Sequence, residues 1–151
     1  MTVVQVDDPR RRSELCDSLL GGLPEWFGIE EANAAYVRDV AELPTFAVDD
    51  EAFLSLKLHS PRAAELFVMA LWRDRHREGL GTQLLESAEA YLCEPGVEYL
   101  HAKRLGPSYP SEGYSATGQF YEAKGLVALE EIHGLWPDNP CLFMVKHLPC
   151  R

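Results

Sequence analysis

Residues 66–72 read LFVMALW, and residues 73–82, which follow directly, read RDRHREGLGT. The first run is apolar throughout and too short to span a membrane, so it predicts a central β-strand that is covered on both faces. In the second run, Gly79 and Gly81 lie where a cationic turn leads into a predicted helix. Because glycine has no side chain, a ligand can approach the backbone closely at this turn.

The helix predicted after the turn has one buried stripe. Its apolar residues are Leu80, Leu84, Leu85, Ala88, Tyr91 and Leu92. Their spacing is that of one face of an amphipathic helix. The start of such a helix offers unpaired N–H groups and the positive end of the helix dipole, so residues 79–82 predict an anion-binding site.

Two common phosphate-binding motifs do not fit this turn. A P-loop requires Lys and then Ser or Thr after its last glycine, whereas Thr82 and Gln83 follow Gly81. The dinucleotide-binding fingerprint requires a third glycine where Leu84 stands. A nucleoside triphosphate or a dinucleotide is therefore not the expected ligand.

The turn instead resembles the pyrophosphate loop of the GNAT acyltransferases. That loop reads Gln or Arg, two variable residues, Gly, one variable residue, and Gly or Ala; here residues 76–81 read HREGLG, with His76 in the first position. In the family, main-chain N–H groups of the loop hold the pyrophosphate of coenzyme A. The coenzyme-binding residues that the resemblance implies here are His76, Arg77, Glu78, Gly79, Leu80, Gly81 and Thr82. The alternative is a glycine-rich helix start without a ligand.

The composition is typical of a soluble globular chain. The 151 residues are 46% hydrophobic and 25% charged, and they are most simply one domain, residues 1–151, with a single sheet-based core. No apolar run has the length of a membrane span and no signal-peptide h-region is present, so a cytoplasmic protein is expected. The four cysteines, which are Cys16, Cys93, Cys141 and Cys150, form no Cys-x-x-Cys pair and predict unpaired thiols rather than a zinc site or a disulfide framework.

The formal net charge of -10 disfavours nucleic acid and anionic membranes as partners. It favours cationic small molecules or basic peptides, which agrees with an amine substrate. Solubility alone also explains an acidic surface.

The other predicted elements indicate an α+β fold. Strands are expected at residues 3–6, 45–48, 53–57, 97–103, 126–131 and 141–147, and helices at residues 13–20, 29–40 and 114–124. The strand at 97–103 should be parallel to the central strand, because a helix connects them. From about residue 23 to 148 this order resembles the GNAT fold, which implies a mixed sheet of six to seven strands. In that fold the two central parallel strands splay apart, so that pantetheine can pair with the backbone at Met69, Ala70 and Leu71.

Two residues resemble catalytic groups of the family. Residues 120–126, FYEAKGL, resemble its second signature, whose tyrosine protonates the leaving thiolate, so Tyr121 is the implied general acid. Residues 64–69, AELFVM, resemble the strand of the histone-acetylating branch that carries the general base, here Glu65. The alternatives are a core tyrosine and a solvated glutamate.

Other polar residues are weaker candidates. Glu98 and His101 are possible substitutes for the base, and His59 and His133 are too isolated in the sequence to suggest a metal site, so none is expected. In the family the acceptor side lies near the residues corresponding to Trp26, Phe27 and Trp136.

Together these patterns favour an N-acetyltransferase that moves an acetyl group from acetyl-CoA to a primary amine of a small molecule or peptide by direct attack in a ternary complex. One alternative is a non-catalytic acyl-CoA-binding sensor on the same fold, and another is an interaction domain without coenzyme. The acceptor, the acyl chain length and the choice between monomer and homodimer stay open.

Overall fold

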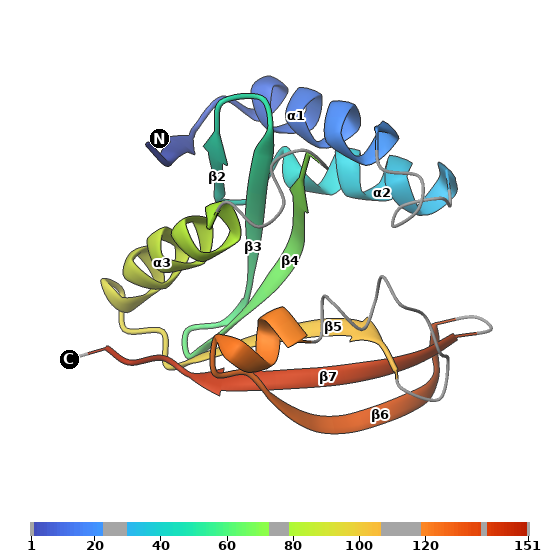
Figure 1. Cartoon of the computed structure of the whole chain (residues 1–151), viewed down its shortest axis with the longest axis vertical. Coiled ribbons are helices and arrows are strands. Elements are labelled where there is room, and N and C mark those ends of the chain that lie inside the picture. Colours follow the sequence, from blue (N-terminus) through green and yellow to red (C-terminus); the bar gives the residue numbers. More distant parts are fainter. Residues whose placement is uncertain (1, 23–29, 73–78, 107–118, 137–138, 151) are drawn as a thin grey trace.

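The computed structural model describes residues 2–22, 30–72, 79–106, 119–136 and 139–150 (Figure 1). The helices are α1 (Pro9–Gly21), α2 (Glu30–Val40) and α3 (Leu80–Cys93), and residues 119–123 form a further short helix. The strands are β1 (Val4–Val6), β2 (Thr45–Val48), β3 (Ala52–Ser60), β4 (Ala63–Leu71), β5 (Tyr99–Leu105), β6 (Val127–Trp136) and β7 (Asn139–His147). They form one seven-stranded sheet in the order β1-β2-β3-β4-β5-β7-β6.

The pairing of β4 with β5 is parallel, and it is also short. Its rungs join Ala63 to Tyr99, Ala64 to Leu100 and Glu65 to His101. Beyond Glu65 the two strands diverge, which Figure 1 shows as a widening space between the green and yellow arrows. This arrangement confirms the predicted mixed sheet with splayed central strands.

Two bulges interrupt the ladder between β3 and β4. Each register shift leaves one extra residue, Phe67 on β4 and His59 on β3. The Phe67 bulge reverses the alternation of β4, so that Leu66 belongs to one core and Val68 to the other. A bulge redirects the side chains around it, and both bulges lie close to the last rung that joins β4 to β5.

The sheet is covered on both faces, as predicted for its central strand. One core contains the buried stripe of α3 together with Leu54, Leu66 and Leu100 of the sheet. The other contains apolar residues of α1 and α2 packed on Phe53 and Val68. None of the described helices combines the length and the apolar character needed to cross a membrane.

The predicted elements are all present where the chain is described, with shifted ends. Helix α1 begins at Pro9 rather than at residue 13, because the Asp8 side chain accepts a hydrogen bond from the backbone N–H of Arg10 and a proline suits the first helical position. Of the helix predicted at 114–124, residues 119–123 are helical, and residues 114–118 lie outside the described residues. Gly125 follows the helix, and its φ of 94° fits the predicted C-terminal cap.

The prediction of four unpaired thiols is wrong for two of them. Cys93, at the end of α3, and Cys150, near the C-terminus, form a disulfide across a sequence separation of 57 residues. The backbone N–H of Leu148 donates to the carbonyl of Glu98, which brings the C-terminal segment beside the end of α3. Cys16 and Cys141 are free and buried, as expected.

Loss of the Cys93–Cys150 disulfide is expected to lower the free energy of unfolding by about 2–4 kcal/mol, because cross-linking a long loop reduces the entropy of the unfolded chain. Urea unfolding of the oxidised protein, the reduced protein and the Cys93→Ser variant measures this loss. The double variant Cys93→Ser/Cys150→Ser should have nearly the same free energy of unfolding as Cys93→Ser alone. Equal stability of the oxidised and reduced protein would contradict the disulfide.

Candidate active site

Glu65 lies at the point where β4 and β5 separate. It occupies the last paired rung, opposite His101. Its neighbours Ala64 and Leu66 point into the core under α3, so Glu65 points to the face covered by α1 and α2. The Glu65 side chain is only 6% exposed, which places a carboxylate inside the protein at the start of the splay.

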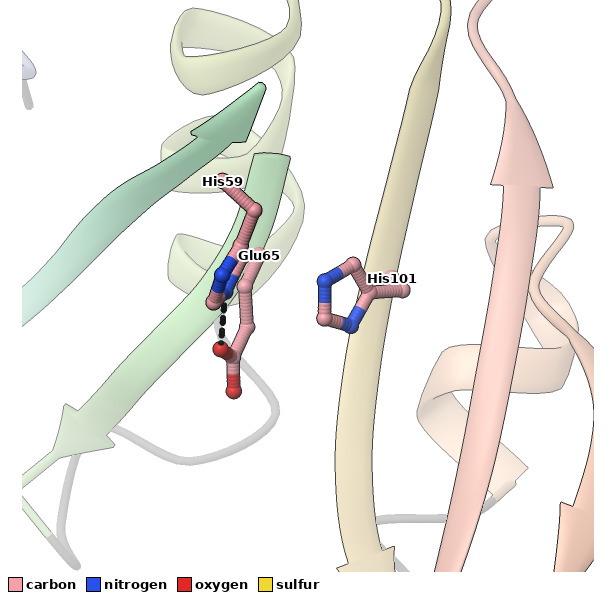
Figure 2. Close-up of side chains that lie close together, drawn as sticks. All are labelled: His59, Glu65 and His101. Carbon is pink, nitrogen blue, oxygen red and sulfur yellow. Dashed lines mark hydrogen bonds and ion pairs between the residues drawn. The ribbon is translucent and has the colours of Figure 1, made fainter. Parts of the chain in front are cut away.

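The two carboxylate oxygens of Glu65 have different partners. One is hydrogen-bonded to Nε2 of His59 at 2.7 Å, which Figure 2 shows as the dashed line. The other lies 3.6 Å from Nζ of Lys103. His59 is the extra residue of the β3 bulge, and its side chain is 38% exposed. The His59 ring therefore links the buried carboxylate to solvent.

His101 completes this group from β5. Its ring centroid lies 5.1 Å from that of His59, and its other neighbour is the stacked ring of Phe143 at 6.1 Å. Figure 2 shows the imidazole edge directed toward Glu65 and His59. Burial lowers the pKa of His101, and this effect outweighs the opposing charge of Glu65, so the neutral ring is favoured. Among the described residues, its Nδ1 atom is buried without a hydrogen-bond partner.

Tyr121 lies on the short helix and packs with the core under α3. Burial raises the pKa of Tyr121 to about 12, with Tyr36 and Glu65 raising it further and Arg104 opposing them. Its phenol therefore keeps its proton at neutral pH. Tyr36 packs with the core under α1 and α2, on the opposite face of the sheet from Tyr121.

The edge of β4 that faces β5 continues beyond Glu65. Met69, Ala70 and Leu71 pair with β3, whereas the parallel pairing with β5 has already ended. The β4–β5 ladder therefore does not cover this part of the edge. An extended ligand with amide groups can pair with such an edge.

The two glycines before α3 have different roles. Gly79 is the N-cap of the helix with a φ of 79°, and glycine supplies no side-chain hydrogen bond to the first turn. Gly81 leaves room for Phe120, because a Cβ atom at this position would lie 3.2 Å from the Phe120 ring. Of the other predicted loop residues, Leu80 is buried and Thr82 half-buried, while His76, Arg77 and Glu78 lie outside the described residues.

The weaker candidates, Glu98, His133 and His59, differ in whether they lie near Glu65. Glu98 pairs with Arg62 at the surface, and this hydrogen bond lowers the pKa of Glu98, so it is a poor base. His133 pairs with Glu131 at 2.9 Å, as expected for a satisfied polar contact. His59 also makes such a contact, but the description of His59 as isolated is wrong, because the bulge and the strand order bring it to Glu65 and His101.

The aromatic residues predicted for the acceptor side are only partly described. Trp136 ends β6 and pairs with Asn139 of β7. Trp26 and Phe27 lie outside the described residues.

Comparison with known proteins supports the fold strongly. No protein-family model matches the sequence, and no curated protein matches it. Among solved structures, a GNAT-family protein from Desulfovibrio desulfuricans has a TM-score of 0.80 at 15% identity, covering 97% of this chain and 98% of its own. An aminoglycoside 6'-N-acetyltransferase complexed with coenzyme A has a TM-score of 0.75 at 19% identity, covering 100% and 99%. The ribosomal-protein-S18-alanine N-acetyltransferase from Escherichia coli has a TM-score of 0.74 at 18% identity, covering 99% and 95%.

The chain therefore has the GNAT acetyltransferase fold over nearly its whole length. The resemblance that the turn and the two short motifs suggested is confirmed at the level of the fold.

The Gly79→Ala variant is expected to lose about 1–2 kcal/mol of stability, because a side chain strains the left-handed backbone conformation. Gly21 is the matched control: like Gly79 it has open space where an added Cβ atom would lie, but it ends α1 without a positive φ. Gly21→Ala should be neutral or stabilising by up to about 1 kcal/mol. Thermal unfolding measures the stability of both variants. Equal effects of Gly79→Ala and Gly21→Ala would contradict the left-handed conformation of Gly79.

Proposed function

We propose that the protein is an N-acetyltransferase that transfers the acetyl group of acetyl-CoA to a primary amine of a small molecule or peptide. The observation that carries this proposal is the position of the buried Glu65 where β4 and β5 separate, together with the buried Tyr121, whose pKa the charge of Glu65 helps to raise. The reaction needs a proton acceptor for the amine and a proton donor for the thiolate. These two side chains are suited to those roles.

The coenzyme would bind across the splay. Its pantetheine arm pairs with the edge of β4 that faces β5, at Met69, Ala70 and Leu71, and its pyrophosphate lies at the N-terminus of α3. Gly79 supplies no capping side chain, and the dipole of α3 favours an anion there. The comparison structure that holds coenzyme A has the same fold, which supports this choice of acyl donor.

Glu65 is the proposed general base, acting directly or through water. An alkylamine has a pKa about three units above neutral, so forming the nucleophilic amine costs roughly 4 kcal/mol. A carboxylate that removes the proton as the N–C bond forms lowers this cost. Since His59 is hydrogen-bonded to Glu65 and half-exposed, it offers the proton a route from the buried carboxylate to water.

Tyr121 is the proposed general acid. The amine nitrogen attacks the thioester carbonyl, the C–S bond breaks, and the phenol donates its proton to the departing thiolate of coenzyme A. The raised pKa of Tyr121 keeps this proton available at neutral pH. The amide and free coenzyme A are the products.

The proposed acceptor is a cationic amine. The net charge of -10 attracts such molecules, and the names of two comparison proteins state an aminoglycoside and a ribosomal-protein alanine as their substrates. The pairing of Glu65 with both His59 and Lys103 favours a second candidate, an acyl-CoA sensor in which Glu65 has a structural role.

Acetyl-CoA is expected to raise the melting temperature by several degrees. Ligand at about one hundred times its dissociation constant adds roughly 2.7 kcal/mol of stability, and this is a measurable shift for a domain of this size. Differential scanning fluorimetry with acetyl-CoA, with free coenzyme A and with ATP as the control measures it. Absence of a shift with either coenzyme form would exclude both the enzyme and the sensor.

Substitution of the two proposed catalytic residues should separate the enzyme from the sensor. Tyr121→Phe and Glu65→Gln should each lower kcat by at least about tenfold, since proton transfer by a positioned side chain typically contributes more than that. The dissociation constant for acetyl-CoA should change little.

Matched controls are available for both substitutions. Tyr91→Phe removes a hydroxyl from a half-buried tyrosine of α3, and Glu89→Gln removes a charge from a partly buried glutamate that pairs with Lys146 at 2.7 Å. Release of free coenzyme A with a panel of aminoglycosides, polyamines and peptides measures kcat. Unchanged turnover in Tyr121→Phe would remove Tyr121 from the mechanism.

A further inference from the structure

His59, Glu65 and His101 form a compact group of metal-ligating side chains. They come from three neighbouring strands, β3, β4 and β5, and one potential ligand atom from each lies within 4.8 Å of the others. Figure 2 shows the hydrogen bond between His59 and Glu65 and the His101 ring turned toward these two residues. Two imidazoles and one carboxylate are a ligand set that borderline divalent metals such as Zn²⁺ prefer.

The burial of the group also suits a metal. Figure 2 shows that the His101 ring is turned toward the other two residues, and among the described residues its Nδ1 atom is buried without a hydrogen-bond partner. Glu65 is a carboxylate held inside the protein at 6% exposure.

We propose that His59, Glu65 and His101 bind one Zn²⁺ ion, and that this ion inhibits the protein by occupying the carboxylate that the acceptor amine needs. The binding stands independently of the proposed function, whereas the inhibition rests on it. Mg²⁺ and Ca²⁺ are not the expected ions, because they prefer oxygen ligands.

The observed distances indicate which side chain must move. Zinc bonds of about 2.0–2.2 Å in a tetrahedron place neighbouring ligand atoms roughly 3.4 Å apart. His59 and Glu65 are closer than this, at 2.7 Å, because they share a hydrogen bond. His59 is 38% exposed and lies on a bulge, so its ring is the most readily reoriented of the three.

Lys103 opposes the ion. Its ammonium group lies 3.6 Å from Glu65, and its repulsion of a nearby divalent cation should weaken binding. Lys103 also lies over the ring of Phe143 at 5.4 Å, so the Lys103→Met side chain can keep an apolar contact there. Removing this charge should therefore strengthen the binding of zinc.

Isothermal titration of the oxidised protein with ZnCl₂ tests the site. One ion per chain is expected. His59→Gln and His101→Ala should weaken binding at least tenfold, and Lys103→Met should strengthen it several-fold. His133→Ala is the matched control, because His133 pairs with Glu131 but is not part of this group, and it should bind zinc like the wild type.

Co²⁺ in place of Zn²⁺ identifies the ligand atoms of the site by spectroscopy. Its visible spectrum should show nitrogen and oxygen ligation without the near-ultraviolet absorption of a thiolate complex, which excludes the free Cys16 and Cys141 as ligands. His59→Gln, at a half-exposed position, should retain the wild-type melting temperature, so its loss of binding cannot be attributed to unfolding. No binding at 100-fold excess of zinc over protein, or unchanged binding in His59→Gln, would refute the site.

The inhibitory effect is measured separately. Zinc should inhibit release of coenzyme A at concentrations that match the titration, and EDTA should restore it. Zinc binding in a protein without transferase activity would support the site and reject the proposed function. Full activity at saturating zinc would refute inhibition while leaving the proposed function intact.

Discussion

The early end of the pairing between β4 and β5 is the constraint on which the site depends. Parallel strands of a continuous sheet satisfy one another's backbone groups, and here that exchange stops after Glu65 and His101. The remaining residues of β4 pair with β3 and no longer pair with β5. The charge of Glu65 helps to raise the pKa of Tyr121, which packs under α3.

The bulges determine which side chains meet at that point. Phe67 reverses the alternation of β4, so that Glu65 and Val68 share one face although they are three residues apart. His59 is the extra residue of the second bulge, and its ring contacts Glu65 rather than continuing a regular ladder. A bulge costs ladder hydrogen bonds, and in return it redirects side chains at positions where a regular strand could not.

The charged and polar neighbours of Glu65 allow its carboxylate more than one role. Glu65 has an imidazole on one oxygen and an ammonium group on the other, so its charge is compensated when no substrate is bound. A carboxylate in this setting can accept a proton, form an ion pair or coordinate a metal ion. Which of these Glu65 does depends on the group that lies beside it. The ammonium group of Lys103 would oppose the proposed zinc ion.

Local pattern was sufficient for the sequence to determine the order of the elements, the buried central strand, the glycine turn before α3 and the two motifs with Glu65 and Tyr121. Each of these depends on residues close together in the chain: an apolar run, a helical stripe, a glycine at a helix end. The tertiary structure alone decided the Cys93–Cys150 disulfide and the meeting of His59 with His101. Both depend on strand order and register across many residues, and one bulge, which no local periodicity encodes, is enough to move a side chain to another face.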